Sequence, residues 1–221
     1  WAYSYDVFGS RIATSFNAAT TQYLVDPADL GDVTAEYDAD GNLIAHYNYG
    51  YGLVSRVGAM GGASYYAFSG TGNTSELTNA VGSLLGPYSY DPFGNLLSNN
   101  PNGNPFQFLG EFGVMSQGDD LNFVRLRQFD SRLGRFLSSD PAGNDSSLNS
   151  YSYVANSPLS FVDIDGRTRI NVNDIKGTFG KAVDSASVAI GVTKRAIGYY
   201  RSHARFLDVV GNYQRLSNIS N

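Results

Sequence analysis

Three charged residues in the second half of the chain have the types and spacing that acid–base chemistry needs. Arg127, Asp140 and Asp163 are separated by 13 and 23 residues. Two carboxyl groups that a fold brings together share one proton, because both cannot ionise cheaply at close range. The ionised group then activates water and the protonated one polarises a peptide carbonyl, while a guanidinium holds one carboxylate ionised. Two carboxyl groups and a guanidinium in this arrangement are typical of an aspartic peptidase.

The same residues also fit a purely structural interpretation. Asp140 begins the sequence Asp-Pro-Ala-Gly, which is typical of a type I turn, and Asp163 begins a second acidic turn that ends at Gly166. Arg127 then forms a salt bridge between neighbouring strands. Asp165 adds a third carboxylate, to which we assign no role in the pair. Residue types alone leave both interpretations open.

The composition predicts a β-rich protein with a core. The 221 residues are 42% hydrophobic and include 25 Gly, 16 Tyr and 13 Phe. Aromatic residues separated by Gly, Asn, Asp and Pro are typical of many short strands. The chain has no Cys and only two His, so we expect no disulfide, no metal site and no cofactor.

A hairpin motif recurs in the first half of the chain. Copies begin at Tyr5, Tyr37, Phe68 and Tyr90, and each continues with Asp or Ser and, three residues later, Gly. The Asp side chain can accept hydrogen bonds from the turn backbone, and Gly supplies the positive φ. Repeated hairpins cannot each bury a face alone, so they should stack side by side. We therefore expect residues 1–166 to be mainly antiparallel β structure, with helix confined to the tail.

Charge divides the chain at Gly166. Residues 1–166 contain 6 Arg, no Lys and 17 acidic residues, which gives −11, whereas residues 167–221 contain 9 Lys plus Arg and 3 Asp, which gives +6. From Asp174 onward apolar residues recur at spacings of three and four, which predicts an amphipathic helix. A basic helix of this kind suits the inside of an acidic shell or a membrane surface. The alternative is a core-packing helix of a small effector domain.

The repeated Tyr-Asp units resemble the YD repeats of the Rhs (rearrangement hot spot) proteins. The segment after them resembles the core domain that ends such repeats, on three stretches: residues 105–111, 119–127 and 133–141. The last of these reads LGRFLSSDP, close to the family's LGRFLSPDP. The resemblance covers about residues 3–166. It divides the chain into YD repeats (1–104), an RHS repeat-associated core domain (105–166) and a variable C-terminal tail (167–221).

The resemblance implies a hollow β-shell whose core domain plugs one end and cuts free an enclosed C-terminal effector. In Rhs toxins and in the C subunits of ABC toxin complexes, an Arg and two Asp at positions matching Arg127, Asp140 and Asp163 carry out this self-cleavage. The carried-over cut lies between Arg167 and Thr168. The family usually has Pro where this chain has Ile164, and Leu where it has Arg167.

These features predict the C-terminal part of a secreted Rhs-type polymorphic toxin that releases its effector by autoproteolysis. Because the chain starts inside a repeat, we expect a longer protein. Expected partners are its own tail, an immunity protein and secretion machinery, with membrane contact open to the tail and no nucleic acid for the acidic core. We expect a secreted or cell-surface location. The alternative is a non-catalytic adhesion protein, teneurin-like or wall-associated, whose shell is structural.

Overall fold

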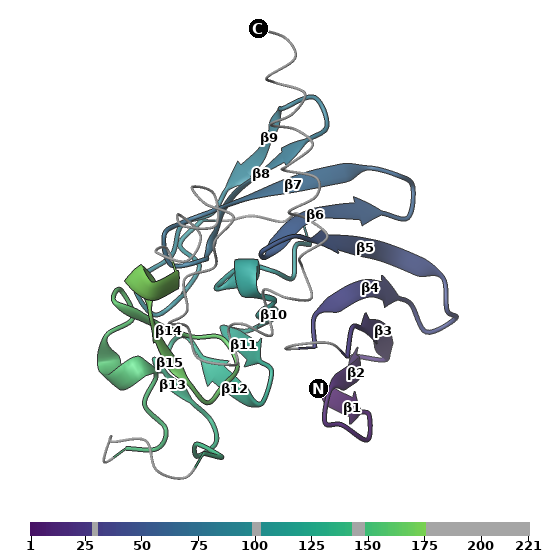
Figure 1. Ribbon diagram of the computed structural model, residues 1–221. Helices are drawn as coiled ribbons and strands as arrows, with labels where there is room; N and C mark the ends of the chain where they lie inside the picture. The colour runs from purple at the N-terminus through teal and green to yellow at the C-terminus, as the bar shows by residue number, and fades with distance from the viewer. Residues whose placement is uncertain (28–30, 99–102, 143–148, 176–221) are drawn as a thin grey trace, which may run out of the picture.

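The computed structural model describes residues 1–27, 31–98, 103–142 and 149–175 of the chain. In this part the protein is mainly antiparallel β structure, as predicted, and its strands form three sheets of nine, four and two strands. Figure 1 shows the nine-stranded sheet arching over the four-stranded sheet, with the two-stranded sheet beside the latter. The short helical elements among the described residues are a 3₁₀ turn at Gly110–Phe112, another at Val154–Asn156 and a helical turn over residues 172–175.

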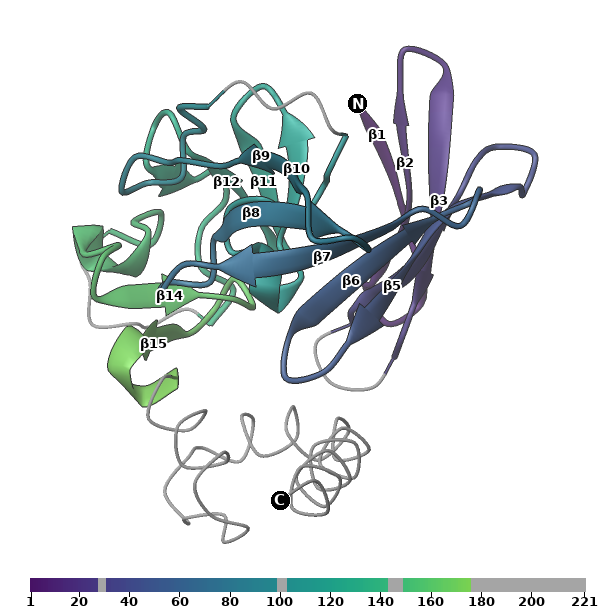
Figure 2. The ribbon, with the colours of Figure 1, turned by 90° about the horizontal axis from the view of Figure 1, so that it is seen from above.

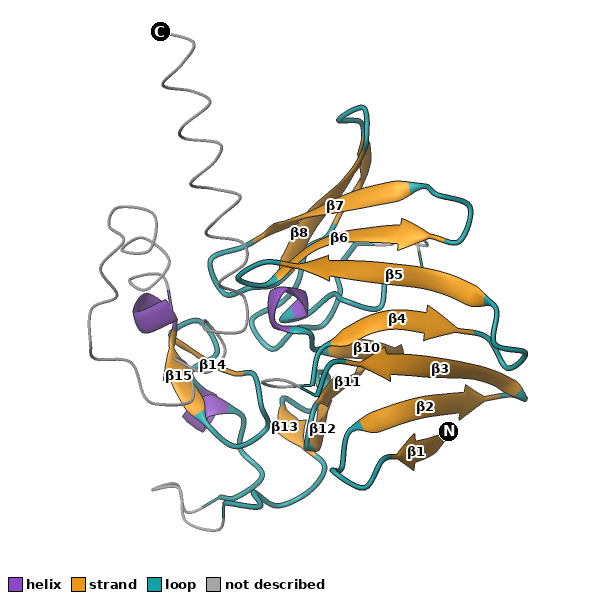
Figure 3. Cartoon of the chain, turned by 45° about the vertical axis from the view of Figure 1, so that its right-hand side comes forward, coloured by secondary structure: helices purple, strands orange, loops and turns teal. Residues whose placement is uncertain are grey.

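The large sheet is a meander in which every strand pairs with the next one along the chain (Figure 3). Figure 2 shows its strands fanning out with the twist of the sheet. This arrangement follows from the short turns, since an antiparallel pair needs only a tight connection. Its strands are β1 (Ala2–Tyr5), β2 (Arg11–Phe16), β3 (Ala19–Val25), β4 (Val33–Tyr37), β5 (Leu43–Tyr49), β6 (Leu53–Gly58), β7 (Ala63–Phe68), β8 (Thr74–Asn79) and β9 (Leu84–Pro87).

In the three repeat copies that contain Asp, its side chain organises the turn, as the motif predicts. Asp38 Oδ1 accepts hydrogen bonds from the backbone N–H groups of Asp40 and Asn42 at 3.0 and 2.8 Å. Asp6 and Asp91 accept the equivalent pair of bonds in their own turns. One Asp side chain therefore accepts hydrogen bonds from two backbone N–H groups of its own turn. The turn can close without contacts from the rest of the fold.

A further turn of the same kind lies between β8 and β9, and it has no Tyr-Asp motif. Asn79 Oδ1 accepts from the N–H groups of Val81 and Ser83 at 3.1 and 2.9 Å. Gly82 follows three residues after Asn79 with φ of 79°. An Asn amide oxygen offers the same acceptor as an Asp carboxylate, so a motif restricted to Tyr-Asp overlooks a functional equivalent.

The predicted core domain contains the two smaller sheets. They consist of β10 (Met115–Gly118), β11 (Leu121–Val124), β12 (Arg127–Asp130) and β13 (Arg135–Phe136), and of β14 (Phe161–Asp163) with β15 (Arg169–Asn171). The helical turn at 172–175 begins two residues before the helix start predicted at Asp174. The remainder of that predicted helix lies outside the described residues.

Two apolar clusters hold the sheets together. One joins the inner face of the large sheet, including Ala45 and Tyr47, to Phe106 and Met115 of the core domain. The other is an aromatic cluster within the core domain, where Phe129 and Tyr153 have ring centroids 4.5 Å apart. Burial of large aromatic side chains is the main favourable term in such a core. The core domain therefore packs on the concave side of the repeat sheet.

Glycines of two repeat turns contact core-domain aromatics directly. A Cβ at Gly72 would lie 2.2 Å from a ring carbon of Phe112, and one at Gly94 would lie 2.4 Å from a ring carbon of Phe108. Both glycines also have positive φ. Because these glycines have no side chain, each turn can pack directly against an aromatic ring of the segment that follows the repeats.

We expect Gly72→Ala to destabilise the protein by about 1–3 kcal/mol more than Gly41→Ala, because of overpacking against Phe112. Gly41 is a matched control, because its φ is +82° against +85° at Gly72 but a Cβ added there would have no atom within 4 Å. Both variants share the strain of a positive φ, which cancels in the comparison. Urea unfolding of both variants measures the difference, and equal losses would mean that the close contact at Gly72 carries no energy.

Candidate self-cleavage site

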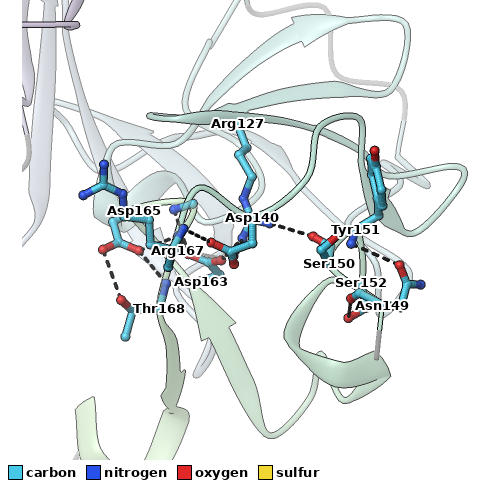
Figure 4. Close-up of polar contacts among 12 residues, drawn as sticks. Arg127, Asp140, Asn149, Ser150, Tyr151, Ser152, Asp163, Asp165, Arg167 and Thr168 are labelled. Carbon is cyan, nitrogen blue, oxygen red and sulfur yellow. Dashed lines mark hydrogen bonds and ion pairs between the residues drawn. The ribbon is translucent and has the colours of Figure 1, made fainter. Parts of the chain in front are cut away.

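The structure brings together the three residues singled out from the sequence (Figure 4). Arg127 Nη2 lies 3.1 Å from Oδ2 of Asp140 and 3.0 Å from Oδ2 of Asp163. Because both oxygens contact one nitrogen, they cannot be farther apart than the sum of these two distances. The two carboxyl groups and the guanidinium therefore form a single cluster, which we call the Arg127 cluster.

Three different elements supply the Arg127 cluster. Arg127 is the first residue of β12, Asp163 is the last residue of β14, and Asp140 lies in the loop after β13. The backbone N–H of Asp140 donates to the carbonyl of Ser150 at 3.0 Å, and Arg127 Nη1 donates to the same carbonyl at 3.3 Å. Asp140 Oδ1 also accepts from the N–H of Ala142 at 2.8 Å, as expected for an acidic turn.

The second acidic turn is held by the other oxygen of Asp163. Its Oδ1 accepts from the N–H groups of Gly166 and Arg167 at 2.7 and 3.1 Å. Gly166 has φ of 74°, and a Cβ there would lie 2.6 Å from the carbonyl oxygen of Val124. Only glycine fits at this position, since the turn is pressed against the backbone of β11.

Ile164 stands at the position where the family that this sequence resembles usually has Pro. Its side chain packs against the aromatic cluster of the core domain. Its carbonyl accepts a hydrogen bond from Nη1 of Arg125, and Nη2 of Arg125 forms an ion pair with Asp32 at 2.8 Å. The turn therefore keeps its Asp cap without Pro, and Arg125 links it to the repeat sheet.

Phe136 also belongs to the site. The guanidinium carbon of Arg127 lies 3.5 Å from the centre of the Phe136 ring, and Phe136 is fully buried. Arg127 itself is 4% exposed. A cation above an aromatic face is stabilised by the ring quadrupole, most strongly when desolvated. Phe136 lies in the LGRFL segment that resembles the Rhs core domain, and neither its residue type nor its spacing from Arg127 signals this contact.

Burial sets the electrostatics of the Arg127 cluster. Removal from water raises the pKa of Asp163 to about 7, and the neighbouring carboxylate of Asp165 contributes to this rise. Arg127 and the N–H of Gly166 act in the opposite direction. A carboxyl group with a pKa near neutrality can hold a proton at physiological pH and donate it, which an ordinary Asp cannot.

The raised pKa of Asp163 predicts that stability falls as the pH rises. The folded state binds this proton more tightly than the unfolded state, so the stabilisation is complete below the unfolded pKa of about 4 and is lost as pH passes through about 7. Between pH 5 and 8 the expected loss is about 1–3 kcal/mol from this group. Burial also raises the pKa of Glu111 to about 7, so Glu111 adds a slope of the same sign.

Urea unfolding at pH 5, 6, 7 and 8 measures this dependence. Asp163→Asn should reduce the slope, Glu111→Gln should reduce it separately, and the double variant should be nearly flat over this range. An Asp163→Asn variant with the full wild-type slope would show that Asp163 titrates as an ordinary carboxyl group.

Other kinds of site are not found in the part of the chain that the structure describes. No group of three or more His, Cys, Asp or Glu side chains there is arranged to hold a metal ion. No helix within the described ranges is long and apolar enough to cross a membrane.

Comparison with known proteins finds the fold in toxin structures. No family model matches the sequence, and no curated protein matches it. The chain is similar to the Tc holotoxin pore of Photorhabdus luminescens with a mutation in TccC3, at 20% identity and a TM-score of 0.59, over 76% of this chain and 9% of that one. It is similar to TcdB2–TccC3 at 20% identity and a TM-score of 0.58, over 74% and 9%. It is also similar to TcdB2–TccC3 without its hypervariable C-terminal region, at 19% identity and a TM-score of 0.55, over 74% of this chain and 9% of that one.

These similarities establish the class of fold. The chain shares the mainly antiparallel β fold of a segment of these toxin chains, and it spans about a tenth of their length. Identity of this order shows a common fold and leaves activity, substrates and partners to be argued from the site. The domain boundaries at residues 104 and 166 stay predictions.

Proposed function

We propose that this chain is the C-terminal part of a secreted Rhs-type toxin and that its core domain cuts the chain between Arg167 and Thr168. The observation that carries the proposal is the Arg127 cluster, in which one buried guanidinium binds two carboxylates from separate elements. One member of the cluster, Asp163, begins the acidic turn that holds the proposed cut, and its Oδ1 accepts from the N–H of Arg167. A fold shared with Tc toxin components supports the assignment.

The carboxyl pair can supply both proton transfers of peptide hydrolysis. Asp163, whose pKa is raised by burial, holds the proton, and Asp140, paired with Arg127, is the carboxylate. The carboxylate takes a proton from water as its oxygen attacks a carbonyl carbon, and the protonated partner gives its proton to the departing amine. Arg127 keeps the pair in place, because its Nη2 contacts one oxygen of each carboxyl group.

The tail is the proposed cargo. It carries +6 against −11 for the rest of the chain, so attraction favours a complex after the cut. One of the similar structures is of TcdB2–TccC3 without its hypervariable C-terminal region, and this supports a variable effector at the same end of the present chain. An immunity protein, secretion machinery and a membrane contact of the tail belong to the same proposal, as does a location outside the cell.

Retention of the cut tail tests this proposal. The purified full-length protein is incubated, and denaturing electrophoresis is compared with gel filtration at low and high salt. We expect two fragments under denaturing conditions that elute together at low salt, with partial release at high salt because charge attraction is screened. Fragments that separate at low salt would contradict retention by charge and enclosure.

The adhesion alternative rests on a different observation. The carboxylate oxygens of Asp140 and Asp163 are engaged by turn N–H groups and by Arg127, which is also what a structural cluster requires. A shell of this kind needs no chemistry. A full-length protein that stays a single chain after prolonged incubation would favour this function.

A further inference from the structure

We propose that residues 168–175, which we call the anchor segment, hold the cut tail on the core domain as a bound β-strand. This inference rests on the proposed function and names the surface that keeps its product. Cutting the Arg167–Thr168 bond then does not by itself release the tail. Withdrawal of the anchor segment from the core domain is the step that frees it.

The proposed cut lies in the turn of a β-hairpin (Figure 2). Strands β14 and β15 are antiparallel, with Asp163 opposite Arg169 and Phe161 opposite Asn171. The Arg167–Thr168 bond belongs to the turn between them, where both residues are exposed. Hydrolysis of this bond therefore removes none of the pairing between the two strands. The new chain end begins one residue before a strand that is still bound to β14.

The anchor segment also supplies apolar side chains to the core domain. Val172 is 6% exposed and belongs to the aromatic cluster, and Ile170 and Ile175 pack against that cluster. The N–H of Val172 donates to the carbonyl of Ser160 at 3.0 Å, which adds a backbone hydrogen bond beyond the end of β15. A peptide bound as an added strand gains affinity from backbone hydrogen bonds and from burial of alternate side chains. The anchor segment has both features.

The attachment through the anchor segment differs in kind from attraction between net charges. Arg169 and Asp174 are the charged residues of the segment, so its formal charge is zero. The guanidinium carbon of Arg169 lies 4.7 Å from the centre of the Phe161 ring, a cation–π contact that adds to the strand pairing. Sodium chloride screens the attraction between the acidic core and the basic tail, but it does not undo the burial of Val172. The anchor segment thus explains why release at high salt should be only partial.

Two neighbouring substitutions in the full-length protein test the anchor segment. Val172→Asp places a charge in the apolar cluster, and Asn173→Asp adds the same charge at the next residue, which is exposed. After self-cleavage, gel filtration at high sodium chloride measures how fast the tail dissociates. We expect dissociation at least about 100-fold faster for Val172→Asp and within about threefold of wild type for Asn173→Asp. A Val172→Asp tail that dissociates as slowly as the wild-type tail would overturn the inference.

Competition by a peptide tests the same surface without changing the protein, which matters if Val172→Asp does not fold. A synthetic peptide of residues 168–175 is added in large excess to the cut wild-type protein at high salt. We expect it to occupy the place of the anchor segment and to increase the amount of tail released, because the tail can no longer rebind. The same peptide with Val172→Asp should release no more tail than buffer does. Equal release by the two peptides would contradict the inference.

An inserted protease site separates this inference from the proposed function. The recognition sequence of a sequence-specific protease is placed between Arg167 and Thr168 of the full-length protein, where the turn is exposed. A protein that never cuts itself would contradict the proposed self-cleavage, yet the protease still makes the cut and the anchor segment is still tested. We expect much of the tail to stay bound at high salt after this cut, and nearly all of it to leave in the Val172→Asp variant. Prompt and complete loss of a wild-type tail would overturn the anchor and leave self-cleavage standing.

Discussion

Replacing Arg127 with Met is expected to lower the free energy of unfolding by about 3–5 kcal/mol. The substitution keeps a long apolar side chain over Phe136 but leaves the carboxyl groups of Asp140 and Asp163 without their cation, and their side chains are only 11% and 5% exposed. A buried charge without a partner carries the full cost of its lost hydration. Urea unfolding at pH 7 measures the loss.

The exposed Arg132, in the turn that follows β12, provides the control. Arg132→Met should change stability by no more than about 0.5 kcal/mol, because surface substitutions away from special contacts have small effects. Arg127→Met should also stop self-cleavage, and Arg132→Met should not. Equal stability of the two variants would mean that the Arg127 cluster does not hold the core domain together.

The second large effect concerns the carboxyl pair. Asp140→Asn and Asp163→Asn should each slow self-cleavage by about 100-fold or more, because an amide keeps the shape and the turn hydrogen bonds but cannot exchange a proton. Denaturing electrophoresis over time gives the rate. Asp38→Asn is the matched control, because Asp38 caps a repeat turn in the way that Asn79 does naturally. Pair variants that cut as fast as this control would leave the structural interpretation of Asp140 and Asp163.

Much of the repeat sheet could be predicted because its information is local. An Asp or Asn that caps its own turn and a Gly three residues later define a hairpin without reference to distant residues. Asn79 falls outside the repeat motif only because the motif fixes the residue type and not its hydrogen-bonding capacity. The docking contacts of Gly72 and Gly94 could not be predicted, because a turn sequence does not say which ring packs on it.

The residues of the candidate site could be predicted from the sequence, but the way in which they come together could not. The resemblance selected Arg127, Asp140 and Asp163, but their convergence depends on three elements that pack across the core domain. The contact of Phe136 with Arg127 and the close approach of Gly166 to the backbone of β11 likewise result from packing between distant segments. Asp165 fits no pair in the sequence, and its hydrogen bond with the N–H of Thr168 appears only in the structure.

The central claim is that this chain cuts itself, and the intact mass of the purified full-length protein tests it most directly. After incubation at pH 6 to 7, where Asp163 holds its proton, we expect two masses whose sum is that of the chain plus one water. The smaller fragment should begin at Thr168, and the larger should end at Arg167. A single mass equal to that of the uncut chain after prolonged incubation would contradict the account.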